Sequence, residues 1–193
     1  MKRKIALLLL IVFAIIQFSA IGSRILKYEN ILETGKVWKL EVKPVDPYDV
    51  LRGRFVRLRF KKDILVQEFP KEEWRINKPG YVFLVKDKEG FAYPKEWVKE
   101  QPENDLQNYI KCSLTSWYNL EKFEWKVVFP FDRFFMNEYK APQAEKVMRS
   151  SFLENHKVYI TLRVKAGIGV IEDLWVDDLT ISQYLDESNN NLK

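Results

Sequence analysis

Five charged residues in turn-rich corners between apolar segments are the strongest candidates for chemistry in this sequence. They are Asp46, Arg52, Arg54, Arg133 and Glu138. An arginine pairs with a carboxylate through two parallel hydrogen bonds, so these residues could form a structural clasp that satisfies the backbone of an irregular corner. We favour this interpretation. The alternative is a polar groove that captures a carboxylate or a peptide segment, with Arg52 and Arg54 as anion clamps.

Strong catalytic signatures are missing from the sequence. It contains no nucleophile elbow, phosphate-binding loop, HExxH or CxxC motif. Cys112 and His156 are the single cysteine and the single histidine, which excludes an internal disulfide and a multi-histidine metal site. We expect Cys112 to be a packed side chain and His156 a turn residue, and we expect no cofactor and no metal. Hydrolytic chemistry through a Ser–Lys pairing at Ser150 or Ser151 stays open.

The net charge of +5 comes from the N-terminal segment. Five basic residues precede Tyr28, so 27 basic residues (32 minus 5) face 27 acidic residues from Tyr28 onward. A domain without net charge lacks the surplus of cations that non-specific nucleic-acid binding requires. We therefore expect no nucleic-acid partner.

An apolar run follows the first basic residues. Residues 5–22 carry no charge, and at about 1.5 Å per residue they reach about 27 Å, enough to cross the hydrocarbon core of a bilayer. By the positive-inside rule the three leading basic residues stay in the cytoplasm, which places the rest of the chain in the periplasm or at the cell surface. We therefore expect a membrane anchor at 1–27, an extracytoplasmic β-rich domain at 28–185 and a disordered polar tail at 186–193.

Alternation of apolar and polar residues predicts that most of the domain is β-strand. Strands are expected at 37–42, 55–61, 81–85, 91–94, 109–118, 123–129, 157–165 and 170–176. Pro94 should end the first hairpin, 63–79 is expected to be a loop, and helical spacing from Ala144 to Phe152 predicts one short helix. Without a strand–helix–strand rhythm, the pattern favours a mainly β, antiparallel barrel- or sandwich-like domain preceded by an N-terminal transmembrane helix.

Several spaced motifs resemble the GDYXXLXY family, membrane-anchored bacterial proteins of uncharacterised function. They are Ile31-Leu32-x-x-Gly35, Pro44-Val45-Asp46-Pro47 with Leu51-Arg52-Gly53, the segment 53–60, the aromatic–Glu segment at 133–145, and Gly169 with Leu174-x-Val176-Asp177. The resemblance covers nearly the whole chain and implies an N-terminal membrane segment followed by an extracytoplasmic domain. It also implies a multi-pass membrane protein as partner, because family members often accompany one.

The name-giving motif departs from the family pattern in this chain. Its residues here are Gly53, Arg54, Phe55, Leu58 and Phe60, with Arg54 in place of Asp and phenylalanine in place of both tyrosines. Any family role of the Asp as acid, base or ligand is therefore lost. Because both rings are kept without their hydroxyls, we expect the aromatic residues to pack.

We expect the chain to be a single-pass, signal-anchored protein whose extracytoplasmic domain acts by binding, as an accessory subunit of a multi-pass membrane protein. The competing class is an enzyme, a cell-envelope hydrolase or ligand-binding enzyme that uses a polar groove at the 46–54 and 133–138 corners. A membrane partner present in stoichiometric amounts would favour the first class. A deep, polar-lined pocket in a protein that purifies alone would favour the second.

The N-terminal segment is expected to remain as an anchor, although Ala20-Ile21-Gly22 offers the small residues that signal peptidase accepts. The apolar run is longer than a usual signal-peptide core, which favours retention. Immunoblotting of membrane and soluble fractions should detect the protein in the membrane fraction at the apparent mass of the full-length product. A shorter, soluble product would show that the segment is cleaved.

Overall fold

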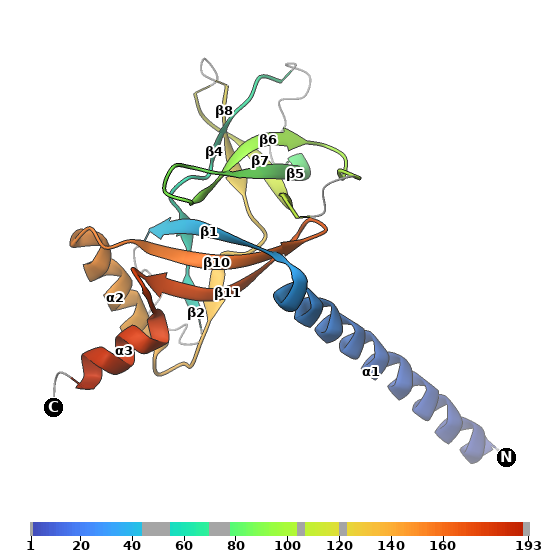
Figure 1. Cartoon of the computed structure of the whole chain (residues 1–193). Helices are drawn as coiled ribbons and strands as arrows, with labels where there is room; N and C mark the ends of the chain where they lie inside the picture. Colours follow the sequence, from blue (N-terminus) through green and yellow to red (C-terminus); the bar gives the residue numbers. More distant parts are fainter. Residues whose placement is uncertain (1, 44–54, 70–77, 104–106, 120–122, 191–193) are drawn as a thin grey trace.

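The computed structural model describes residues 2–43, 55–69, 78–103, 107–119 and 123–190. A long N-terminal helix projects from a mainly β domain that is built from two antiparallel layers (Figure 1). The Asp46, Arg52, Gly53 and Arg54 positions of the expected corner lie outside the described residues.

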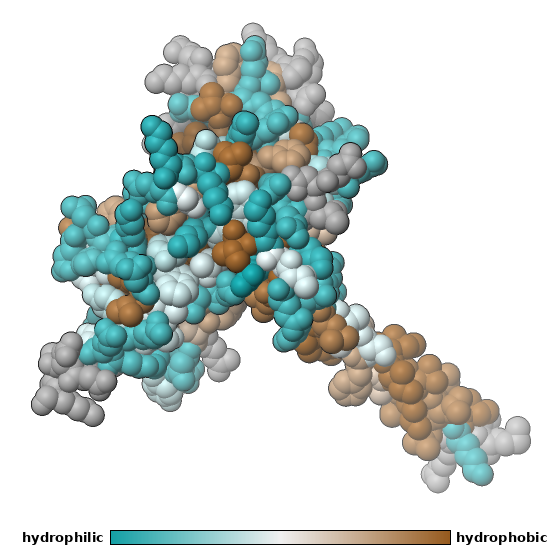
Figure 2. Space-filling model, in the orientation of Figure 1, coloured by the Kyte–Doolittle hydropathy of each residue, from teal (hydrophilic) through white to brown (hydrophobic). Residues whose placement is uncertain are grey.

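Helix α1, Lys2–Thr34, is long and apolar enough to cross a membrane over Leu7–Thr34. Its leucine, isoleucine and phenylalanine side chains are exposed between Leu7 and Ile25, and Figure 2 shows this stretch as a brown rod attached to a largely teal domain. Apolar surface of that extent is stable in lipid rather than in water. The helix is continuous across the expected boundary at residues 27 and 28 and ends seven residues later, at Thr34 (34 minus 27).

The first layer is a nearly closed, barrel-like sheet of order β12-β11-β10-β1-β3 in which neighbouring strands are antiparallel. Its strands are β1 (Lys36–Lys43), β3 (Arg59–Phe60), β10 (Val158–Lys165), β11 (Ile168–Val176) and β12 (Leu179–Thr180). Two further strands extend it, because β2 (Phe55–Arg57) leads into β3 and pairs with β9 (Arg133–Phe135). The N–H of Leu58 donates to the Asp132 carbonyl at 2.8 Å and continues this pairing between β2 and β3. The layer therefore runs from β11 through β10, β1 and β3–β2 to β9.

The second layer is a five-stranded antiparallel sheet of order β4-β8-β7-β5-β6. Its strands are β4 (Ile64–Val66), β5 (Lys78–Lys86), β6 (Ala92–Val98), β7 (Tyr109–Asn119) and β8 (Glu124–Val128). The parallel bridge between Ile110 and Gly167 joins the two layers, and the Lys111 N–H donates to the Gly167 carbonyl at 2.8 Å. One hydrophobic core extends through both layers, from Trp38 and Leu162 to Leu114 and Trp125.

Two helices pack together against the first layer (Figure 1). Helix α2, Ala141–Leu153, buries Ala144 and Met148, and Pro142 lies in its first turn, where a proline needs no N–H partner. Helix α3, Ile181–Asn190, buries Ile181 and Leu185. The apolar spacing on each helix thus supplies the face that covers the barrel-like layer.

The predicted fold class is confirmed, since the domain is mainly β and antiparallel, barrel-like and preceded by an apolar helix. The prediction of one short helix in the domain was incomplete, because α3 follows α2 as a second helix. Residues 186–190, where a disordered tail was expected, form the C-terminal half of α3. Burial of Leu185 stabilises that helix, and Asp186 forms a largely exposed ion pair of 2.7 Å with Lys140. Residues 191–193 of the expected tail lie outside the described residues.

Two expected loop or strand boundaries were also wrong. Residues 64–66 form β4 within the expected loop, because Leu65 enters the core and the segment pairs with β8. β6 continues past Pro94 to Val98. β6 is an edge strand with a register shift opposite Phe83 and Leu84, and an edge tolerates a proline without an N–H.

The foot of α1 is fixed to the β10–β11 hairpin. Ile31 is buried, and the Gly35 N–H donates to the Ile31 carbonyl at 2.8 Å. Lys165 Nζ donates to Asn30 Oδ1 and Thr34 Oγ1, each at 2.7 Å, and Arg163 Nη1 donates to the Gly35 carbonyl at 3.3 Å. The C-terminal end of α1 is therefore attached to the β domain by these contacts.

Gly35→Ala is expected to weaken this attachment. A Cβ at Gly35 would lie 2.5 Å from the Ile31 carbonyl oxygen and 3.1 Å from Val164 N, and backbone atoms on both sides cannot move aside cheaply. The free energy of unfolding should fall by about 1–3 kcal/mol, which lowers the melting temperature of the detergent-solubilised chain by about 2–4 °C per kcal/mol. In Gly22→Ala, the matched control, nothing lies within 4 Å of the new Cβ, so no loss is expected. An unchanged melting temperature in Gly35→Ala would contradict a docked helix foot.

Candidate functional site

A groove of about 780 Å³ lies where the barrel-like layer is incomplete, between β9 and β11. Tyr28 of α1 contributes to one wall, and Ser182 of α3 lies at another. Met136, just after β9, and Ile171 of β11 also line it. The groove thus joins the foot of helix α1 to β9 and β11.

Phe131 fills the floor at one end of the groove. Its ring stacks on Phe129 with a centroid separation of 5.4 Å and meets Phe60 edge-on at 5.7 Å. Gly169 permits this position, because a Cβ there would lie 2.9 Å from Phe131 Cε1. The floor is therefore an aromatic cluster that belongs to the hydrophobic core.

Four charged residues, Arg133, Lys140, Glu172 and Asp173, form the rim of the groove, and three of them make ion pairs. Arg163 binds Glu172 Oε1 through Nε at 3.0 Å and Nη2 at 2.8 Å, and Lys140 pairs with Asp186. Arg133 Nε lies 3.3 Å from Asp132 Oδ1. These ion pairs are partly or largely exposed, so each contributes little to stability.

Asp173 is the exception on this rim. Among the residues that the structure describes, its carboxylate has no cationic partner, and its Oδ1 accepts the N–H of Leu174 at 2.7 Å. Burial raises the pKa of the Asp173 carboxyl, the Leu174 N–H opposes that rise, and the charge of Glu172 adds to it. An acidic group therefore lines the groove without a cationic partner in the described part of the chain.

The structure places five of the predicted site residues, and the other four lie outside the described residues. Leu58 and Phe60 are buried, and Phe55 is half-buried with its ring 5.8 Å from that of Phe135. Arg133 lies over the Phe55 ring with its guanidinium carbon 4.9 Å from the centroid, a cation–π contact. Glu138 is exposed between β9 and α2. The motif segment and the 133–138 corner thus meet through the pairing of β2 with β9.

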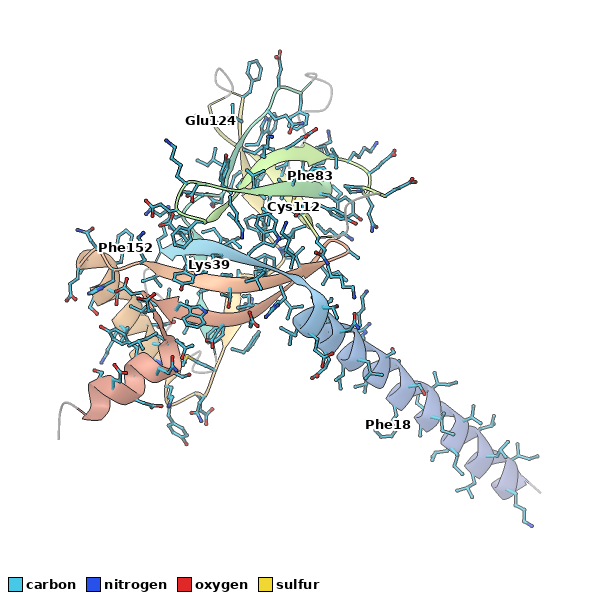
Figure 3. The ribbon with its side chains drawn as sticks, in the orientation of Figure 1. Phe18, Lys39, Phe83, Cys112, Glu124 and Phe152 are labelled. Atoms are coloured by element: carbon cyan, nitrogen blue, oxygen red, sulfur yellow. The ribbon has the colours of Figure 1, made fainter. Side chains whose placement is uncertain are left out.

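The other candidate side chains have structural surroundings. Cys112 is buried among the strands of the second layer (Figure 3), and burial raises the pKa of its thiol to about 12. His156 lies between α2 and β10 with Nδ1 2.5 Å from Asp177 Oδ2. Ser150 Oγ donates to the Val147 carbonyl at 3.1 Å, and Ser151 is buried. Among the described residues no group of His, Cys, Asp and Glu side chains could hold a metal ion.

A family model described as GDYXXLXY protein matches residues 17–174, most of the chain. The chain belongs to the GDYXXLXY family. No curated protein and no solved structure matches it. The predicted resemblance is confirmed, and the match includes residues 17–34 of α1 and the groove-lining residues other than Ser182.

Family segments that are far apart in the sequence converge on this groove. Gly35 anchors α1 beside it, Phe60 and Gly169 hold Phe131 in its floor, and the aromatic pair Phe134 and Phe135 lines it. Sequence reasoning missed Tyr28, Met136, Ile171 and Asp173. The only available signal was the broken alternation of β11, where a register shift sets Asp173 opposite Thr161 and Ile171 opposite Leu162.

Asp173→Asn should raise the melting temperature at pH 7. The pKa of Asp173 in the folded state is above its ordinary value of 3.8, so the ionised carboxylate destabilises the fold at neutral pH. This penalty is fully present above the folded pKa and disappears as the pH falls below 3.8. Asparagine can still accept the Leu174 N–H through its Oδ1.

Thermal unfolding of both proteins between pH 3.5 and pH 7 checks this expectation. The difference between Asp173→Asn and the unmodified chain should shrink as the pH falls toward 3.5. A destabilised Asp173→Asn protein at pH 7 would show that the carboxylate has a charged partner in the native state.

Proposed function

We propose that this chain is a membrane-anchored accessory protein whose extracytoplasmic domain binds a multi-pass membrane protein through the groove between β9 and β11. The observation that carries the proposal is the position of the groove: Tyr28 of the membrane-spanning helix forms part of its wall. A binding surface that includes the anchor helix itself favours a partner that lies in the same membrane.

The height of the groove above the bilayer supports such a partner. The apolar run ends at Gly22, and Tyr28 follows six residues later (28 minus 22), which is about 9 Å along a helix at about 1.5 Å per residue. The polar headgroup region extends about 5–8 Å beyond each side of the hydrocarbon core. Tyr28 would therefore stand just outside the headgroups, at the level where the loops of a multi-pass protein emerge.

Exposed aromatic side chains beside the groove suit a protein interface. Phe135, the last residue of β9, exposes 68% of its surface, and Tyr139, between β9 and α2, exposes 78%. Large aromatic residues that are solvent-exposed in the free protein commonly supply the main contacts of an interface. The anchor, the groove and these rings together support a binding role.

Affinity purification of the full-length chain in mild detergent, followed by mass spectrometry, tests the proposal. We expect a multi-pass membrane protein in stoichiometric amount. Phe135→Glu should reduce its recovery by about ten-fold, because the substitution removes an aromatic contact and places a charge at the rim. Val66→Glu is the matched control, since Val66 exposes 67% of its surface on β4 of the other layer. A chain that purifies alone, or equal losses in both variants, would contradict the proposed function.

A further inference from the structure

We propose that the groove binds its partner by strand addition: an extended segment of the partner polypeptide pairs between β9 and β11 and completes the barrel-like layer. This inference rests on the proposed function, because it states how the groove would hold the membrane partner. It commits to a polypeptide segment as occupant. A lipid chain and a second copy of this protein are the competing occupants.

The strand order leaves a seam in the first layer. β10 and β1 each have a neighbouring strand on both edges. β9 pairs with β2 on one edge. β11 pairs with β10 along one edge, and on its other edge it pairs with β12 at Trp175 and Val176 only. Within the described residues, no strand pairs with the outer edge of β11 between Ile168 and Leu174. The groove lies along this seam, where Cα atoms of β9 and β11 approach within 8 Å. A strand between them needs a separation of about 9.6 Å, so binding must widen the seam.

The turn that precedes β11 determines which of its backbone groups point into the seam. Ala166 and Gly167 have φ values of 50° and 78°, which is typical of a two-residue type I′ turn flanked by the hydrogen-bonded pair Lys165 and Ile168. Hydrogen-bonded and non-hydrogen-bonded pairs alternate along an antiparallel ladder. The N–H and C=O groups of Gly169 and Ile171 therefore point away from β10 and toward the groove.

Leu174 shows how this edge is satisfied where it has no neighbouring strand. It lies two residues before Val176, which pairs with β12, so its N–H points to the same side as the groups that face β12. That N–H donates to Asp173 Oδ1 at 2.7 Å. A side chain from the preceding residue thus takes the place of a strand.

The opposite wall of the groove is a second open edge. Because the Leu58 N–H donates to the Asp132 carbonyl, the same alternation directs the backbone groups of Phe134 toward β2. The N–H and C=O groups of Arg133 and Phe135 then face the seam. Donors and acceptors are therefore available on both sides of the groove.

The direction and length of the seam define the segment. Antiparallel pairings link β11 to β10, β10 to β1, β1 to β3 and β2 to β9, so β11 and β9 run in the same direction. An inserted strand would be antiparallel to both. From Gly169 to Asp173 the edge spans about 13 Å at about 3.3 Å per residue, which accommodates about four or five residues.

The side chains around the seam define the chemistry of the segment. Phe131 and Ile171 offer apolar contacts to residues that point into the barrel-like layer. On the rim, Arg133, Lys140 and Glu172 already have partners, whereas Asp173 has no cationic partner among the described residues. We therefore expect a segment with alternating apolar residues and one Lys or Arg that pairs with Asp173.

Amide hydrogen exchange tests the binding mode. The full-length chain in detergent is compared alone and with its co-purified partner, with fragmentation to single-residue resolution. The amides of Gly169, Ile171 and Phe135 should exchange at least about ten-fold more slowly in the complex than in the isolated chain. The exchange rate of the Ile64 amide, on β4 of the second layer, should not change. A complex in which the three seam amides exchange as in the isolated chain would overturn strand addition and leave the proposed function intact. The absence of any partner would overturn both.

Photo-crosslinking identifies the occupant in the native membrane. Benzoylphenylalanine replaces Phe135, which is 68% exposed, or Val66 on β4 as the control, which is 67% exposed. We expect a polypeptide adduct only at position 135, with the attachment site in a segment of alternating apolar residues that contains a Lys or Arg. An adduct on lipid, an adduct on a second copy of this chain, or no adduct at position 135 would overturn the inference.

Discussion

The backbone of a β-strand carries hydrogen-bonding groups along both edges, and a barrel satisfies them only when every neighbouring pair of strands is joined. Here the pairing is continuous from β12 through β11, β10, β1 and β3–β2 to β9, and among the described residues no strand pairs with the other edge of β9. Phe131 against Gly169 defines one end of the gap, because the ring occupies the space that a Cβ would need. The groove is thus a consequence of strand order and one aromatic ring.

Under the proposed function, helix α1 would hold the groove at a fixed place relative to the membrane. A flexible tether after residue 22 would let the domain turn freely, but α1 continues to Thr34 and is held by hydrogen bonds from Lys165 and Arg163. Those two residues belong to β10, which pairs directly with β11. The position of the groove wall is therefore coupled to the orientation of the helix through one hairpin.

Much of the fold was predictable because period-two alternation is a local signal. The 81–85 and 91–94 hairpin, the 123–129 strand and the 157–165 strand all appeared from this pattern. The apolar helix was predicted from an uninterrupted charge-free run, which is also a local signal. Helix α3 was missed because its polar C-terminal half resembles a tail, and only the burial of Ile181 and Leu185 reveals its packing face. The proline in β6 was misinterpreted because its edge position is a property of the sheet.

The groove could not be predicted, because it depends on contacts between distant residues. The pairing of Phe55 with Phe135 and the approach of Phe131 to Gly169 join segments that no local pattern links. Sequence reasoning did identify Phe55, Phe60 and Arg133, which lie in or behind the groove wall. It placed the emphasis on charge, whereas the described residues build the site mainly from aromatic packing and open strand edges.

A structure of the full-length chain bound to its co-purified membrane partner, determined by cryo-electron microscopy, tests the central claim most directly. The account predicts an extended partner segment between β9 and β11, antiparallel to both, with backbone hydrogen bonds to Gly169 and Ile171 and a basic side chain at Asp173. A partner bound elsewhere on the domain, with the groove filled by lipid or solvent, would contradict it.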